Sequence, residues 1–151
     1  MRYIAAFLLM SLLFCGCAKN SVSKIPQISL NAFLPMDSMR VNLDTVLLDF
    51  NLTDGDGDIG NAPASGIFYL DSRYPGGGFL RADFPAIDPS IEDPKKGLQG
   101  SVLFYPIPQP TPRTDTLHPT RDTFHYEFYV TDRAGHESNH VITHDLIIKR
   151  K

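Results

Sequence analysis

Two segments of this chain alternate apolar and polar residues over four consecutive pairs. The apolar positions are 46, 48, 50 and 52 in the first segment, and 124, 126, 128 and 130 in the second. A period of two residues is that of a β-strand with one face in a core and the other in water. We therefore expect residues 46–53 and 123–130 to be strands, with their apolar positions buried.

Weaker strand patterns follow the same rule, and no window after the N-terminal segment has a helical period bounded by caps. The 12 prolines and 11 glycines of the chain also favour strands joined by loops. About seven strands with some long connections predict an all-β fold, an immunoglobulin-like β-sandwich over residues 27–151. The weaker strands are expected at 27–33, 66–72, 79–84, 100–105 and 140–149.

The N-terminus has the features of an export signal over residues 1–16. Arg2 provides the positive start, and an apolar run covers residues 4–14. Eleven helical residues reach roughly 16 Å, about half of the hydrocarbon core of a bilayer. We expect this run to engage the export machinery without remaining as a membrane span.

The end of that run resembles a bacterial lipobox. Gly16 and Cys17 fit the pattern, whereas Phe14 and Cys15 replace the usual Leu and the usual Ala or Ser. The resemblance implies that Cys17 is acylated and anchors the chain to a membrane, with residues 17–26 as a tether. Ala18 after the cysteine implies an outer-membrane lipoprotein of the cell envelope, facing the periplasm or the surface. The alternative is a plainly cleaved signal, or a free pair of thiols.

Three aspartates separated by glycines follow the first strong strand, in the run Asp54-Gly55-Asp56-Gly57-Asp58. This spacing lets the backbone wrap so that carboxylate oxygens converge, as a hard cation with six to eight oxygen ligands requires. Without a cation, each close pair of carboxylates costs on the order of 1 kcal/mol even in water. The alternative is a set of Asp-Gly turns. An EF-hand does not fit, because Ile59 and Ser65 occupy the positions that need glycine and glutamate.

The remaining ligands are expected in the loop after the second strong strand. In an immunoglobulin-type order both strong strands run in the same direction, so their exit loops emerge at the same end. We therefore expect Asp132 first, and also Glu137 and Asn139, to join Asp54, Asp56 and Asp58 around one calcium ion.

The stretches FNLTDGDGDIG and FYVTDRAGHESN resemble the calcium-binding ends of bacterial immunoglobulin-like domains. Together with the lipobox, they resemble small surface lipoproteins of Bacteroidetes-type bacteria, over residues 25–148. The resemblance implies a β-sandwich, an envelope location and bound Ca²⁺, and it implies no particular activity.

His136-Glu137-x-x-His140 matches H-E-x-x-H, the helical pattern of zinc hydrolases. Gly135 before the motif and the β-branched residues after it predict a loop entering a strand, where the two histidines do not converge. A zinc-dependent hydrolase is thus the alternative function, and we expect no enzyme.

The net charge and two long loops bear on what the chain could bind. A net charge of −3 with scattered basic residues predicts no nucleic-acid partner. Residues 74–99 and 106–119 form long connections rich in proline or glycine, which either bind a partner or cross the surface passively. We expect a binding module for a glycan or an envelope protein, or a structural envelope protein.

Overall fold

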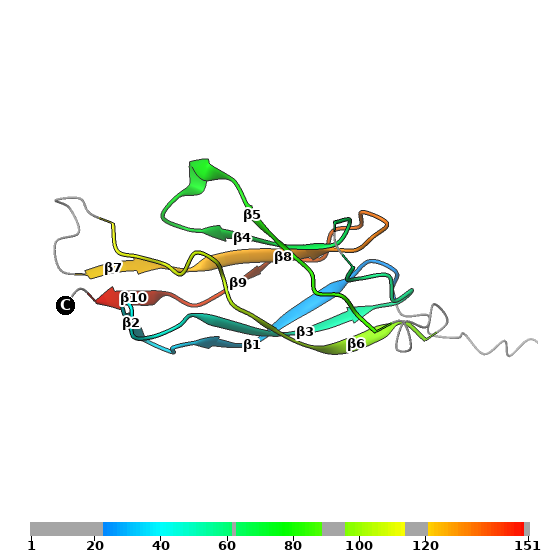
Figure 1. The fold of residues 1–151 in the computed structure, drawn as a ribbon, viewed down its shortest axis with the longest axis horizontal. Coiled ribbons are helices and arrows are strands. Elements are labelled where there is room, and N and C mark those ends of the chain that lie inside the picture. The colour runs from blue at the N-terminus through cyan, green and yellow to red at the C-terminus, as the bar shows by residue number, and fades with distance from the viewer. Residues whose placement is uncertain (1–22, 62, 89–95, 114–120, 150–151) are drawn as a thin grey trace, which may run out of the picture.

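The protein, seen here as a computed structural model, is an all-β sandwich of two layers (Figure 1). The structure describes residues 23–61, 63–88, 96–113 and 121–149. The predicted signal, the lipidation residue Cys17 and most of the tether lie outside these ranges. The strands are β1 (Gln27–Leu34), β2 (Ser38–Arg40), β3 (Leu47–Asp54), β4 (Gly66–Asp71), β5 (Leu80–Asp83), β6 (Leu98–Phe104), β7 (Arg121–Phe124), β8 (Tyr126–Thr131), β9 (Val141–Ile142) and β10 (Leu146–Lys149).

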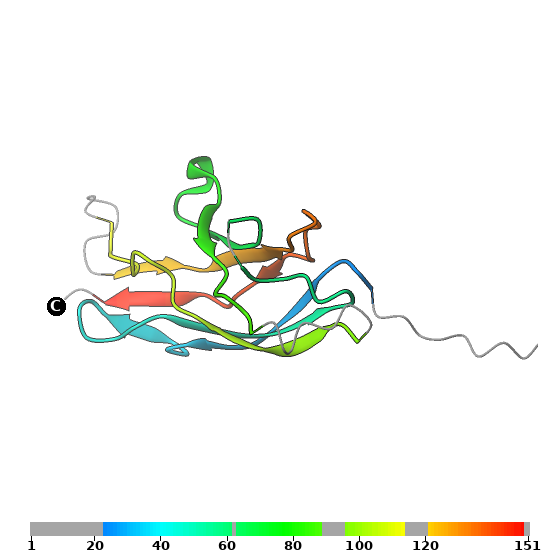
Figure 2. The ribbon, with the colours of Figure 1, turned by 45° about the vertical axis from the view of Figure 1, so that its right-hand side comes forward.

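One layer is the antiparallel sheet β1-β3-β6. The other contains the sheet β5-β4-β8-β9 and, further along the same layer, the sheet β2-β10-β7 (Figures 1 and 2). The chain thus changes layers between β1 and β2, and β2 pairs in parallel with β10. This distribution of strands over two layers agrees with the immunoglobulin-type order expected from the sequence.

The predicted inward faces of the two strong strands form the centre of the core. The side chains at positions 46, 48, 50 and 52 and at positions 124, 126, 128 and 130 are all buried. Phe50 of β3 meets Phe128 of β8 across the layers, with ring centroids 5.2 Å apart. The core therefore fixes β3 and β8 against each other, which determines where their exit loops lie.

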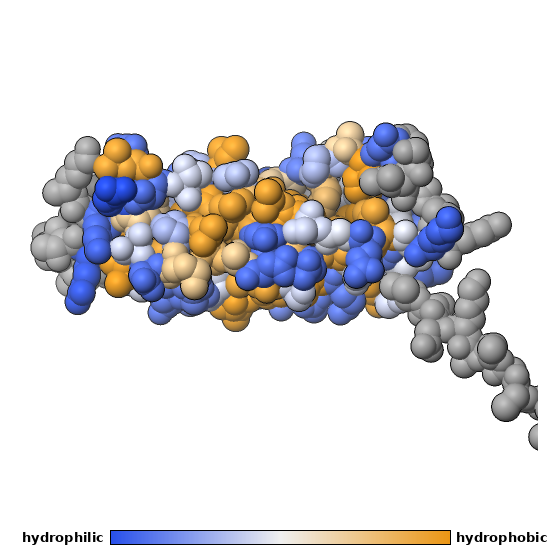
Figure 3. Space-filling model, turned by 90° about the horizontal axis from the view of Figure 1, so that it is seen from below, coloured by the Kyte–Doolittle hydropathy of each residue, from blue (hydrophilic) through white to orange (hydrophobic). Residues whose placement is uncertain are grey.

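The outward face of the β1-β3-β6 sheet is polar where the alternation predicts it. Asn31 bonds with Asn51 and Asp49, and the Ser101 hydroxyl donates to Asp49. Figure 3, seen from below, shows hydrophilic and hydrophobic surface side by side on this face. Leu103 of β6 contributes exposed apolar surface.

The structure differs from the sequence expectation in three elements. Residues 38–40 form the unexpected strand β2, the segment 123–130 is divided at His125 into β7 and β8, and the segment 140–149 is divided into β9 and β10. A 3-10 turn, η2 (Pro75–Gly77), precedes β5. Among the described residues, no helix has the length and apolar character to cross a membrane.

Candidate metal centre

Four aspartates from two distant parts of the chain converge at one end of the sandwich. Asp54 ends β3, Asp56 and Asp58 follow it, and Asp132 comes directly after β8. One carboxylate oxygen of each residue lies within 4.8 Å of those of the other three. The sequence prediction that the exit loops of the two strong strands meet is thereby confirmed for these four residues.

Buried oxygens without hydrogen bonds distinguish this cluster from a patch of surface acids. Asp54 is 0% exposed, and neither of its carboxylate oxygens has a hydrogen-bond partner among the residues that the structure describes. Asp56 and Asp58 each have one further buried oxygen in the same condition. Buried polar atoms are nearly always paired in folded proteins, so these orphaned acceptors are arranged for a positive ligand.

The electrostatics of the cluster agree with that conclusion. Burial, followed by repulsion from Asp56, Asp58 and Asp132, raises the pKa of Asp54 to about 6. Burial and repulsion from Asp132 and Asp56 also raise the pKa of Asp58. Both shifts mean that the folded chain carries these charges at a cost that a bound cation would offset.

The loop after β3 is held in place by contacts on both sides of its acidic residues. Ile59, directly after Asp58, is fully buried in the core. The backbone N–H of Gly60 donates to the hydroxyl of Ser65 at 2.9 Å, and Ser65 is itself buried. The loop is thus anchored where it returns to the sandwich, and its carboxylates keep their positions.

Gly97, in the turn that precedes β6, lies directly beneath the acidic loop. Its backbone has a φ of +71°, and a Cβ atom there would lie 2.5 Å from the carbonyl oxygen of Asp54. Only glycine accepts both this conformation and this approach without displacement. Gly97 therefore allows the turn before β6 to pack closely against the backbone of Asp54. No sequence motif indicated this residue as part of the site.

Asp132 is oriented by His136. The backbone N–H of His136 donates to Oδ1 of Asp132 at 2.7 Å, and its ring Nδ1 lies 2.7 Å from Oδ2. The hydrogen bond to Asp132 is the main reason why the pKa of His136 is raised. The second loop thus presents its carboxylate in a fixed orientation.

The donor set fits a calcium ion. Ca²⁺ takes six to eight oxygen ligands at about 2.3–2.6 Å, so oxygens on opposite sides of one ion lie up to about 5 Å apart. The separation of up to 4.8 Å in the cluster is compatible with that sphere. Within the described ranges no histidine or cysteine is grouped with the four carboxylates, and such an all-oxygen set favours a hard cation over zinc.

Glu137, predicted as a further ligand, is not grouped with the four aspartates. Glu137 forms an isolated antiparallel bridge with Thr131, and directly opposed residues point to the same face of a sheet. Asp132, the next residue after Thr131, points to the other face. Glu137 is 54% exposed and lies 2.8 Å from Nε2 of His140.

Asn139, the other expected ligand, has both ends of its side chain engaged elsewhere. Its Oδ1 accepts from the backbone N–H of Ile28, and its Nδ2 donates to the carbonyl oxygen of Ile28, both at 2.9 Å. This side chain therefore continues the pairing of β1 instead of extending the acidic cluster.

The H-E-x-x-H segment lies in irregular backbone apart from the bridge at Glu137, and it leads into β9. His136 contacts Asp132, whereas His140 lies between Glu127 and Glu137 and stacks on Tyr129. The two histidines therefore contact different groups and do not share a site. The helical arrangement that zinc hydrolysis needs is not present in this segment.

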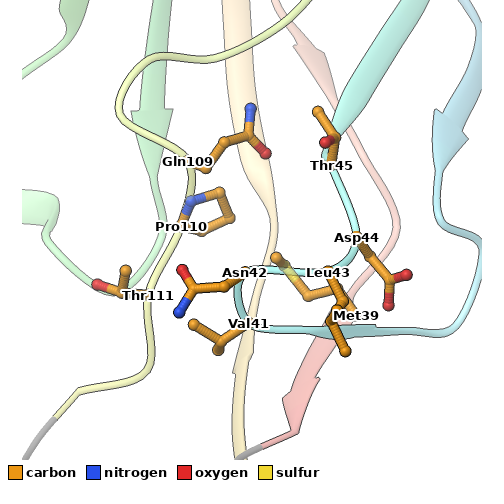
Figure 4. A pocket seen from close by; sticks show the side chains of 9 residues that line it. All are labelled: Met39, Val41, Asn42, Leu43, Asp44, Thr45, Gln109, Pro110 and Thr111. Carbon is orange, nitrogen blue, oxygen red and sulfur yellow. The ribbon is translucent and has the colours of Figure 1, made fainter.

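The described parts of the two long loops meet beside β4 and the start of β8. A cavity of about 240 Å³ lies between Tyr74 and Leu80 on one side and Pro108–Thr111 on the other. The buried Tyr126 also lines it. A second cavity of about 300 Å³ lies across the same 109–111 segment (Figure 4). It is lined by Met39, Val41, Asn42, Leu43, Asp44, Thr45, Gln109, Pro110 and Thr111.

A buried ion cluster beside these cavities has no counterpart in the sequence analysis. The Arg73 guanidinium, 3% exposed, bonds with Asp71, with Asp122 and with the carbonyl oxygen of Thr111. Arg113 donates to the same Asp122 carboxylate. Arg73 and Asp122 are 49 residues apart and belong to no motif, so only the fold reveals their pairing.

Comparisons of this chain with protein-family models, with curated proteins and with solved structures give no match.

Proposed function

We propose that this chain is an exported envelope lipoprotein whose sandwich is clamped by one calcium ion and acts as a binding or structural module. The observation that carries the proposal is the convergence of four carboxylates around the fully buried Asp54, whose two oxygens have no hydrogen-bond partner in the described part of the chain. The lipobox-like end at Cys17 supports the anchored, exported form.

The calcium ion would act mechanically. It would join the loop that leaves β3 to the loop that leaves β8, and these strands belong to opposite layers. A ligand that binds only the folded state stabilises it by RT ln(1 + [L]/Kd), about 2.7 kcal/mol when the ligand is in hundredfold excess over Kd. Outside the cytoplasm, the metal would thus strengthen the seam between the two layers.

The binding role is supported by the meeting of the two long loops. The cavity between Tyr74 and Pro108–Thr111 combines aromatic walls with a few polar groups, which is the usual character of small ligand sites. A glycan or an envelope protein is the partner expected there. Removing the exposed ring with Tyr74→Ala should then reduce binding and leave the calcium response intact.

The decisive experiment is a thermal melt of the purified protein in calcium, in magnesium and in EDTA. We expect Tm to rise with calcium by several degrees, and Asp56→Ala to abolish that rise. The exposed Asp37, remote in sequence from the cluster, provides the matched control as Asp37→Ala. Equal melting curves in calcium and EDTA would contradict the calcium clamp.

Lipidation has a separate test. Mass spectrometry of the mature N-terminus should find acyl chains on Cys17, and Cys17→Ala should release the protein from the membrane fraction. Three acyl chains anchor a protein stably, because each buried methylene contributes about 0.8 kcal/mol. An unmodified Cys17 in the mature protein would overturn the lipoprotein assignment.

A further inference from the structure

The N-terminal segment 23–28 contacts the acidic loop after β3. The backbone N–H of Gly55, between the first two aspartates, donates to the carbonyl oxygen of Ser23 at 2.8 Å. The ammonium of Lys24 lies 3.6 Å from Oδ2 of Asp56. The chain that enters the sandwich therefore passes directly beside the candidate calcium ligands.

The same segment also contacts the second acidic loop. Ile28 exchanges two hydrogen bonds with the side chain of Asn139, seven residues after Asp132. Segment 23–28 thus extends from one ligand-bearing loop to the other. A ligand that holds the two loops together would therefore also hold Gly55 and Asn139, the hydrogen-bond partners of this segment.

The contact of Lys24 with Asp56 differs from these hydrogen bonds, because the Lys24 side chain is flexible and 75% exposed. An ammonium at this distance partly neutralises Asp56, which a calcium ion would also use. Lysine and metal therefore compete for the same carboxylate. The competition is modest and depends on salt, as for other exposed ion pairs.

We propose that segment 23–28 is a working part of the calcium site: bound calcium immobilises the segment, and Lys24 weakens calcium binding by competing for Asp56. This inference rests on the proposed function, since it needs the calcium clamp. Coupling between two sites is reciprocal, so a fixed segment also favours calcium. The calcium level would then control how rigidly the sandwich is held on the tether that precedes it.

Amide hydrogen exchange, measured by NMR with and without calcium, tests the immobilisation. The informative amides are those of Gly55 and Ile28, whose acceptors are Ser23 and Asn139. The amide of Ile147, which donates to Asp37 at the other end of the sandwich, is the internal control. We expect calcium to slow exchange at Gly55 and Ile28 by about fivefold or more relative to Ile147.

Calorimetry on the same sample separates the two possible failures. If calcium binds and the amides of Gly55 and Ile28 exchange as before, the inference is overturned and the clamp stands. If calcium does not bind, the clamp and the inference both fail. Asn139→Ala should remove the calcium-dependent protection of Ile28 and, because the coupling is reciprocal, weaken calcium binding without abolishing it.

Lys24→Gln tests the competition. At low salt we expect calcium to bind about two to five times more tightly to this variant, with the difference disappearing at high salt. Lys24→Arg keeps the charge and should bind as the wild type does. Lys149→Gln, an exposed lysine at the end of β10, is the matched control. Equal affinities for Lys24→Gln and Lys149→Gln would overturn the competition.

Discussion

The backbone N–H of Arg133 donates a hydrogen bond to the carbonyl oxygen of Asp58, at 3.2 Å. This bond joins the loop after β8 to the loop after β3, and so it links the two layers at the end that carries the acidic cluster. The four aspartates therefore belong to two loops that the backbone itself holds together. The repelling carboxylates are therefore already held in one site before any cation binds. A cation would not have to bring the two loops together.

Asp54→Asn should change stability in opposite directions with and without calcium. In EDTA the variant is expected to be more stable than the wild type at pH 7, because it removes a buried charge whose pKa is raised to about 6. A pKa raised by about two units corresponds to roughly 3 kcal/mol as an upper bound. In calcium the variant should be the less stable protein. Urea unfolding in both conditions measures the two differences, and Asp37→Asn should show neither.

Gly97→Ala should destabilise the protein by about 2 kcal/mol or more and weaken calcium binding. The new Cβ would meet the carbonyl oxygen of Asp54 and require a positive φ that alanine adopts poorly. Gly76→Ala is the control, because no atom lies within 4 Å of its added Cβ. Urea unfolding and calcium titration of both variants provide the comparison. A Gly97→Ala protein with wild-type calcium affinity would contradict the role given to this turn.

The lowered pKa of Asp122 predicts that the free energy of unfolding falls in acid, whether or not calcium is present. Burial opposes its charge, but hydrogen bonds from Arg113 and Arg73 hold the pKa of Asp122 well below its ordinary value. A lowered folded-state pKa contributes stability above the unfolded value of about 3.9 and loses it as the pH falls further. Asp122→Asn should cost roughly 3 to 5 kcal/mol at pH 7, because it leaves a buried arginine short of a partner.

The pH dependence identifies the cause of that loss. The gap in unfolding free energy between wild type and Asp122→Asn should narrow steadily from pH 5 to pH 2, in EDTA as well as in calcium. A gap that stays constant over this range would show that packing, and not charge, accounts for it.

Glu137→Gln should leave the calcium-dependent rise in Tm unchanged. The side chain of Glu137 lies on the outer face beside His140, opposite to the direction of Asp132. Melting curves of Glu137→Gln and Asp132→Asn in calcium and EDTA provide the contrast, since only the second should lose the response. If both lose it, Glu137 is a ligand and the loop rearranges around the metal.

The fold was predictable where the alternation of residues was strong. The alternation at 46–53 and 123–130 indicated the buried faces correctly, but it could not show the division at His125, because Phe124 and Tyr126 on either side are both buried. Strand β2 has three residues and one buried side chain, Met39, so it leaves no periodic pattern. Its pairing with β10 depends on contacts distant in sequence.

The candidate site was predictable to the extent that topology fixes it. The convergence of Asp132 with the three earlier aspartates was predictable because β3 and β8, in opposite layers, end at the same end of the sandwich (Figure 2). Glu137 and Asn139 were grouped with it only by proximity in sequence, and the bridge from Thr131 to Glu137 reverses the chain between them. Gly97 and the pair of Arg73 with Asp122 depend on tertiary contacts that no local pattern reveals.

The change of layer between β1 and β2 determines how the sandwich would respond to a pulling force. With β2 parallel to β10, tension applied between Ser23 and Lys149 runs along these strands and loads their hydrogen bonds together in shear. The bonds would have to fail as a group, whereas a hairpin pulled from one end opens one pair at a time. A chain held at its N-terminal end and pulled at its C-terminal end would therefore resist extension most strongly through the short strand β2.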